Sequence, residues 1–168
     1  MNRILRLLRH RWWDEADVGR AVPAAALSRI EARVAESERG HSGEIRVVVE
    51  AGLPLSYLWK RLSPRQRAVM LFGKLRVWDT EHNNGVLVYL LLAEHAIEIV
   101  ADRGLARAVS PAEFEALLGP MREAFRAGRF EQGLLLTIDR LDALLRQHFA
   151  LAEGQRNPNE LPDRPLVQ

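Results

Sequence analysis

The sequence predicts an α/β protein: an α/β/α sandwich in which helices flank a small mixed β-sheet. Residues 44–51 form a β-branched run and residues 85–93 a strongly apolar run. Both are typical of buried strands, and a helical pattern separates them. A strand–helix–strand unit normally makes a right-handed crossover between parallel strands. A third apolar run, at 96–102, follows after a short turn and forms a hairpin with the second. The sheet is therefore expected to contain a parallel crossover and a hairpin.

Helices are expected around these strands, because each helical segment has a capping signal at its start or a stripe of apolar side chains. Ser63-Pro64 and Ser110-Pro111 both place a capping serine before a proline at the first helical position. Proline inside a helix removes a backbone donor, so the helix after Ser110 is expected to be disturbed at Gly119-Pro120. A further short strand is expected around residues 54–59. The helices are expected from Pro23 to before Gly40, from Ser63 to Trp78, from Ser110 onward, and from Phe130 to near Phe149.

The organisation predicted is one domain with two tails. The 168 residues, 48% of them hydrophobic and 27% charged, suit a single globular domain. Residues 1–20 are expected to form a basic amphipathic segment and a linker, and residues 21–150 the domain. Residues 151–168 contain three prolines and many polar side chains without a packing period, so they are expected to be a disordered tail.

The composition excludes several classes of protein. Without cysteine there is no disulfide scaffold, thiolate zinc site or cysteine nucleophile. The balance of 24 basic and 22 acidic residues gives no sign of nucleic-acid binding. No GxSxG, Walker or strand-linked GxGxxG motif is present. The longest apolar run, residues 86–93, is too short to span a membrane, and the N-terminus is no secretory signal, so a cytoplasmic location is expected.

Polar side chains gather at one edge of the predicted sheet. The crossover places Glu44 and Gly85 at this edge, and the hairpin, with Leu87 expected to face Asp102, brings Asp102 near the loop 79–84. Such oxygens suit Ca²⁺ or Mg²⁺. The alternative is that they serve the turn, cap helices and bind backbone amides. The metal ligands are expected among Glu44, Asp79, Glu81, Asn83, Asn84 and Asp102.

Other metal chemistries fit less well. His41 and His82 could meet Glu44 to hold zinc, but no HExxH or paired-histidine spacing supports this. The alternation from Asp79 to Asn83 is similar to an EF-hand loop, but Leu90 stands where its closing glutamate belongs, which excludes that motif. If the protein is an enzyme, metal-assisted hydrolysis of a phosphate ester fits best, because a cation would polarise the phosphoryl oxygen.

Basic residues are concentrated in two segments. Residues 51–78 contain six basic and no acidic side chains, which suits phosphate, anionic lipid or an acidic partner, or simply a solvated helix face. Residues 3–13 form an amphipathic helix that rests either on an anionic membrane surface or partner, or on its own domain. Peripheral contact with the inner membrane through residues 3–13 is thus one hypothesis.

Three segments together resemble the TPM domain, which occurs in thylakoid-lumen proteins and in many bacterial proteins. They are HSGEIRVVVE, WDTEHNNGVLVYLLLAEHAIEIVADRG and MREAFRAGRFEQGLLLTIDRL, and the resemblance covers residues 22–148. The WDT and ADRG variants are similar to a soluble bacterial branch, without the signal peptide and trailing membrane helix of other members. Asn84-Gly85 matches the Asn-Gly before the second strand of the family, whereas Asn83 replaces a commonly acidic residue.

The resemblance implies an α/β/α sandwich that binds Ca²⁺ or Mg²⁺ at acidic residues near the sheet edge. For plant members it also implies an acid phosphatase activity. Three hypotheses follow: a cation-binding accessory protein with a protein partner, such as a membrane protein; a metal-dependent phosphatase; and a metal-free interaction module. The second and third would use the acidic edge and the basic segments, respectively.

Overall fold

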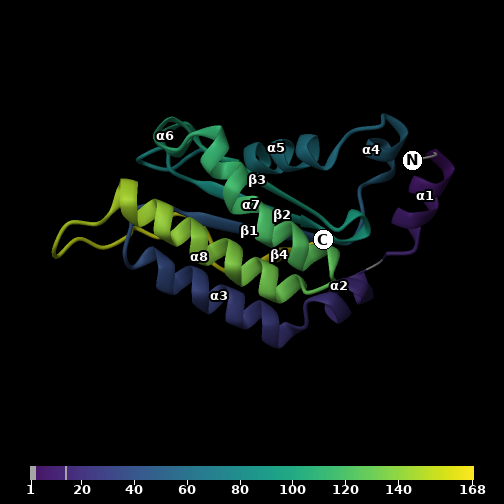
Figure 1. Cartoon of the computed structure of the whole chain (residues 1–168), viewed down its shortest axis with the longest axis horizontal. Coiled ribbons are helices and arrows are strands. Elements are labelled where there is room, and N and C mark those ends of the chain that lie inside the picture. The colour runs from purple at the N-terminus through teal and green to yellow at the C-terminus, as the bar shows by residue number, and fades with distance from the viewer. Residues whose placement is uncertain (1–2, 14) are drawn as a thin grey trace.

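The structure, a computed structural model, describes residues 3–13 and 15–168 and confirms the predicted sandwich (Figure 1). Four strands form one open mixed sheet in the order β3-β2-β1-β4. β1 is parallel to β2 and β4, and β2 is antiparallel to β3. The crossover and the hairpin are therefore both present. The strands are β1 (Ile45–Glu50), β2 (Val86–Leu91), β3 (Ala96–Ala101) and β4 (Leu166–Val167).

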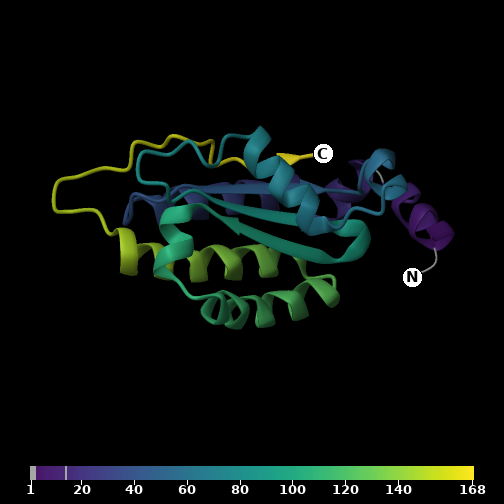
Figure 2. The ribbon, with the colours of Figure 1, turned by 90° about the horizontal axis from the view of Figure 1, so that it is seen from above.

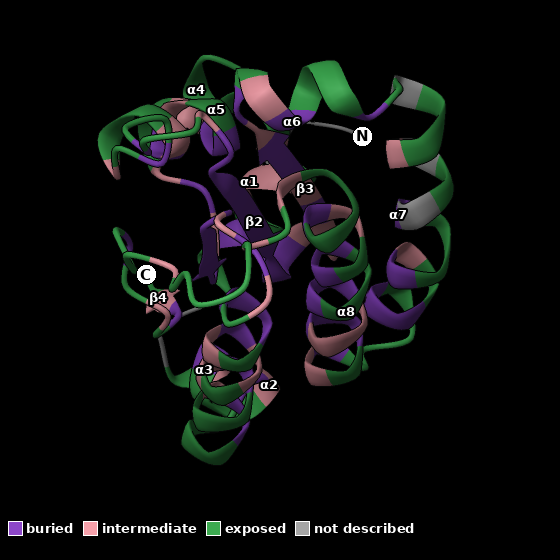
Figure 3. Cartoon of the chain, turned by 90° about the vertical axis from the view of Figure 1, so that its left-hand side faces the viewer, coloured by how far each residue is buried: buried purple, intermediate pink, exposed green. Residues whose placement is uncertain are grey.

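Helices cover both faces of the sheet, which is why its strands carry apolar side chains on both faces (Figures 2 and 3). Val47 and Val49 of β1 enter the core cluster with α3, α7 and α8, whereas Val48 enters the cluster with α5. Side chains alternate between the two faces because the strand period is two. The main helices are α3 (Ala24–Glu38), α5 (Pro64–Lys74), α7 (Pro111–Arg126) and α8 (Phe130–Phe149).

Both predicted capping serines begin helices. Ser63 and Ser110 each form a capping box, at α5 and α7. The predicted disturbance at Pro120 is wrong, since α7 continues through it. Its apolar side chains Leu118, Met121 and Phe125 are buried against the core, and this packing offsets the hydrogen bond that proline cannot make.

Several short elements differ from the sequence prediction. Residues 54–59, expected as a strand, hold the helix α4 (Leu55–Trp59), which follows Pro54. Part of the expected linker forms α2 (Glu15–Ala21), while residues 1, 2 and 14 of the N-terminal segment lie outside the described residues. The remaining short helices are α1 (Arg3–Arg11), η1 (Leu92–Glu94) and α6 (Arg103–Ala108).

The register of the hairpin formed by β2 and β3 differs from the prediction by two residues. Leu91, not Ala93, pairs with Ala96, because η1 and the left-handed His95 (φ 48°) form the turn. Gly85 rather than Leu87 therefore lies beside Asp102. A shift of two residues keeps each side chain on the same face, so the predicted edge survives the error.

The C-terminal segment 151–168, predicted to be disordered, instead lies along the sheet. β4 pairs with Val48 and Val49 of β1, and the Arg46 Nη1 donates to the Pro162 carbonyl oxygen at 2.8 Å. Leu161 is buried. Backbone pairing and one buried leucine hold the segment, and neither produces the amphipathic period that sequence reasoning looks for. In the described part of the chain no helix is long and apolar enough to cross a membrane.

Candidate functional site

The predicted convergence occurs where β1 and β2 begin and β3 ends, which we call the amino edge. The Val86 N–H donates to the Glu44 carbonyl at 2.8 Å, and the Asp102 N–H donates to the Gly85 carbonyl at 2.9 Å. Glu44 and Gly85, directly before β1 and β2, and Asp102, directly after β3, therefore lie in neighbouring positions at one edge of the sheet.

The middle position of the amino edge requires glycine. A Cβ added to Gly85 would lie 2.0 Å from the carbonyl oxygen of Val77, which belongs to the turn after α5. The turn thus packs its backbone directly onto the strand between Glu44 and Asp102. A side chain here would have to push this backbone away.

Replacing Gly85 with alanine is expected to cost about 1–3 kcal/mol of folding stability, the usual range for overpacking. Gly73→Ala is the matched control, because a Cβ on Gly73 meets nothing within 4 Å and alanine is the better helix former by up to about 1 kcal/mol. Urea unfolding of the two variants should shift the midpoint in opposite directions. Equal midpoints would show that the turn adapts freely.

Glu44 is a fully buried carboxyl group with one oxygen engaged. Its Oε2 accepts a hydrogen bond from the Leu161 N–H at 3.1 Å. Its Oε1 is buried and has no hydrogen-bond partner among the described residues. Burial raises the pKa of Glu44 to about 7, so the charged form is costly in the absence of a counter-charge.

Asp102 is similarly divided between a structural role and an unused oxygen. Its Oδ1 accepts from the Arg103 N–H at 2.7 Å and caps α6, as the turn interpretation predicted. Its Oδ2 is buried and, within the described residues, forms no hydrogen bond. Asp102 itself is 3% exposed. Asp102 can therefore cap α6 with one oxygen and still offer its other oxygen to a metal ion.

The two asparagines before β2 hold the loop in shape. The Asn84 N–H donates to Thr80 Oγ1 at 3.1 Å, and its Nδ2 donates to Ser42 Oγ at 3.0 Å. Asn83 is left-handed (φ 52°), and its carbonyl accepts from the Gly104 N–H at 2.7 Å. The side-chain oxygens of both asparagines accept hydrogen bonds within the protein, Asn84 from Thr80 and Asn83 from Arg103.

The structure does not bury Asp79 and Glu81 with Glu44 and Asp102. Both residues are exposed in the segment between α5 and β2. The backbone N–H of Asp79 donates to the Arg76 carbonyl, and that of Glu81 to the Glu160 carboxylate at 3.2 Å. Their carboxyl groups thus belong to the surface of the loop.

His41 is held inside the protein. Its Nε2 lies 2.8 Å from Ser37 Oγ, and its Nδ1 lies 3.0 Å from the Gly43 carbonyl oxygen. Burial lowers the pKa of His41 to about 4. Both ring nitrogens are engaged, and His82 is exposed, so the arrangement does not favour the zinc alternative.

Sequence reasoning missed a further acidic group behind the amino edge. Glu38, at the end of α3, is 4% exposed, and its Oε1 accepts from the Ile45 N–H at 2.8 Å. Burial, followed by the charge of Glu44, raises the pKa of Glu38 to about 9, and Asp163 acts in the same direction. Glu38 continues the buried stripe of Ile30 and Val34, a signal that was available; Asp163 lay in the segment predicted to be disordered.

The amino edge thus offers two buried carboxylates. Among the described residues, no group of three or more His, Asp or Glu side chains is arranged to hold a metal ion. A closed, all-protein metal cage is therefore absent from this part of the chain. Glu44 and Asp102 could supply charge and two oxygens to a cation that completes its coordination with backbone oxygen or solvent.

Several known structures share this fold, and two of them cover most of this chain. The NMR structure of the BA42 protein from the psychrophilic bacterium Bizionia argentinensis superimposes with a TM-score of 0.75 and 26% identity, over 86% of this chain and 94% of that one. The N-terminal domain of a P. gingivalis protein gives a TM-score of 0.60 and 18% identity, over 77% and 82% of the respective chains. A comparison with proteins of curated function gives no match.

The family follows from the sequence as well as from the fold. The TPM domain profile matches residues 17–144, which include the whole of β1, β2 and β3, the helices α3, α5 and α7, and most of α8. This span contains the amino edge. The chain therefore belongs to the TPM domain family.

Proposed function

We propose that this TPM domain is an accessory binding protein that takes up a divalent cation, Ca²⁺ or Mg²⁺, at the amino edge. The observation that carries the proposal is the pair of buried carboxylate oxygens, Glu44 Oε1 and Asp102 Oδ2, that have no hydrogen-bond partner within the described part of the chain. A buried polar atom without a partner lowers stability, and a cation bound at the amino edge would give such an oxygen a partner.

The chemistry of the amino edge supports a hard cation. Mg²⁺ is usually bound through one or two carboxylates while it keeps several water molecules, and Ca²⁺ accepts carboxylate and carbonyl oxygens in flexible geometry. Glu44 and Asp102 would supply the charge. A bound cation would also favour the ionised form of Glu44, whose pKa burial raises.

A titration of the full-length, ¹⁵N-labelled protein with Ca²⁺ and with Mg²⁺ tests the proposal. The amide resonances of Gly85, Val86 and Asp102 are expected to shift together and to saturate. Glu44→Gln and Asp102→Asn should each weaken cation binding by at least about tenfold. Replacing a residue that only hydrogen-bonds to a metal ligand already lowers metal affinity by about tenfold or more, and loss of a ligand should cost at least as much.

Asp79→Asn and Glu81→Gln are matched controls, because each removes one exposed carboxylate from the adjacent loop. They should change the affinity by less than Glu44→Gln does. Shifts confined to residues 79–81 would move the site to the loop surface and contradict the proposal. The absence of any shift at millimolar cation would overturn it.

A further inference from the structure

One end of the molecule combines exposed apolar and basic side chains. α1 and α4 lie together there, at the opposite end of the sheet from the amino edge (Figure 1). We propose that this end docks on the surface of an anionic lipid bilayer. The inference is independent of cation binding.

α1 rests on the domain through its polar face. The Arg6 Nε donates to Glu94 Oε1 at 2.7 Å, and Arg6 Nη2 donates to the Leu62 carbonyl at 2.9 Å. The His10 Nε2 lies 2.8 Å from the same Glu94 oxygen, and His10 Nδ1 accepts from the Leu53 N–H. These contacts fix the orientation of the helix.

This orientation leaves an apolar stripe of α1 in solvent. Leu5 is 60% exposed and Leu8 is 49% exposed, and Trp12, directly after the helix, is 81% exposed. Their spacing of three and four residues places them on one side of the helix. A helix that only packed on its own domain would turn these side chains inward, so the arrangement calls for a partner outside the chain.

α4 extends the same surface. Leu58 is buried and anchors α4, whereas Leu55 is 68% exposed and Trp59 is 71% exposed. We call the surface formed by these two helices the terminal patch. It contains five of the eight large apolar side chains that are exposed among the described residues: Leu5, Leu8, Trp12, Leu55 and Trp59.

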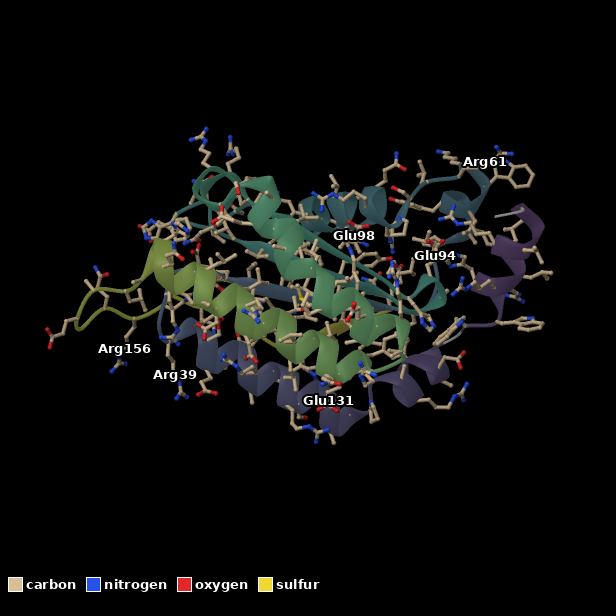
Figure 4. The ribbon with its side chains drawn as sticks, viewed as in Figure 1. Arg39, Arg61, Glu94, Glu98, Glu131 and Arg156 are labelled. Carbon is tan, nitrogen blue, oxygen red and sulfur yellow. The ribbon has the colours of Figure 1, made fainter. Side chains whose placement is uncertain are left out.

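The charge around the terminal patch is positive. Arg9, Arg11, Lys60 and Arg61 are all exposed, and neither residues 3–13 nor residues 51–61 contain an acidic side chain. Glu94 lies close by but is paired with Arg6 and His10, so it does not offset the exposed charges (Figure 4).

This combination matches an anionic bilayer. Tryptophan favours the headgroup region, leucine favours the acyl boundary, and each Lys or Arg near an anionic surface contributes about 1 kcal/mol. A single nine-residue helix offers little area for such binding. α4 supplies the additional aromatic and apolar side chains, as well as the adjoining Lys60 and Arg61.

Sedimentation of the full-length protein with vesicles tests the inference. Vesicles of phosphatidylglycerol and phosphatidylcholine should bind the protein, and vesicles of phosphatidylcholine alone should bind it far more weakly. The double variant Arg9→Gln/Lys60→Gln should bind the anionic vesicles at least about tenfold more weakly, since each lost charge corresponds to about fivefold. Added salt should weaken binding of the original protein.

A second double variant, Trp12→Ser/Trp59→Ser, should lose binding, whereas the control Trp78→Ser should retain it. Trp78 is 47% exposed, and it lies after α5, outside the terminal patch. Brominated lipid should quench tryptophan fluorescence in the original protein and in Trp78→Ser. Circular dichroism should show that all these variants stay folded.

Three results would overturn the inference. The first is equal sedimentation with charged and neutral vesicles, and the second is equal loss of binding in Trp78→Ser. The third is a dimer that depends on Trp12 and Trp59 and forms without any binding to vesicles. That result would assign the terminal patch to a second copy of the chain.

Discussion

Replacing Arg67 with alanine is expected to destabilise the protein by about 3–5 kcal/mol, the usual cost of leaving a buried charge without its partner. Arg67 reaches from α5 to the end of β1, where its Nε donates to Glu50 Oε2 at 3.0 Å and its Nη2 donates to Glu50 Oε1. The Tyr89 hydroxyl donates to Glu50 Oε2 at 2.6 Å. Glu50 is only 3% exposed. Without Arg67, the Glu50 carboxylate would be buried with one neutral donor.

Urea unfolding measures this effect, and two further variants make the result specific. Lys74→Ala removes an exposed cation from the same helix and should change stability by no more than about 0.5 kcal/mol. Arg67→Met/Glu50→Met removes both charges and should recover much of the loss. A loss below about 1 kcal/mol in Arg67→Ala would show that water reaches Glu50.

Ionisation of Glu38 is expected to lower stability by about 3 kcal/mol as the pH rises from about 6.5 to 9, at about 1.4 kcal/mol per pH unit. Burial raises the pKa of Glu38 from 4.5 to about 9, so the folded protein retains a proton that the unfolded chain releases. The contribution of Glu38 is complete below pH 4.5 and is lost as the pH rises towards 9. His41 has the opposite effect, but its pKa of 6.5 when unfolded and about 4 when folded confines that effect to lower pH.

Glu38→Gln should remove most of this pH dependence. Glutamine keeps the oxygen that accepts from the Ile45 N–H and, like protonated glutamic acid, offers a donor in place of the second oxygen. Glu36→Gln is the control, because Glu36 is exposed on the same helix. The free energy of unfolding of each variant is measured by urea unfolding at several pH values, with a chelator present. Parallel pH curves for Glu38→Gln and the original protein would contradict the prediction.

The sequence predicted the central fold because the local signals agreed with the packing. Strands buried on both faces leave runs rich in apolar and β-branched residues, and Ser63 and Ser110 sit where capping boxes form. The crossover and the hairpin then required that Glu44 and Asp102 approach the same sheet edge. Even the two-residue error in the hairpin did not disturb this result, because the side-chain period of a strand is two.

The candidate site was only partly predictable. Glu44, Asn84 and Asp102 are buried at the amino edge, whereas Asp79 and Glu81 are exposed in the loop beside it. Sequence spacing places a loop near an edge, but the backbone conformation within the loop decides which carboxyl groups turn inward. The left-handed residues Arg76 and Asn83 shape this loop, and their conformation does not follow from residue type alone.

The sequence by itself thus determined the three main strands, the four main helices, their order and the family, because periodic burial and capping are local properties of the chain. Only the tertiary structure decided two other features: the course of residues 151–168 along β1 and the face of α1 that remains exposed. Each depends on contacts between residues far apart in the chain, such as Arg6 with Glu94. Such contacts form through hydrogen bonds and single buried side chains, which leave no period in the sequence.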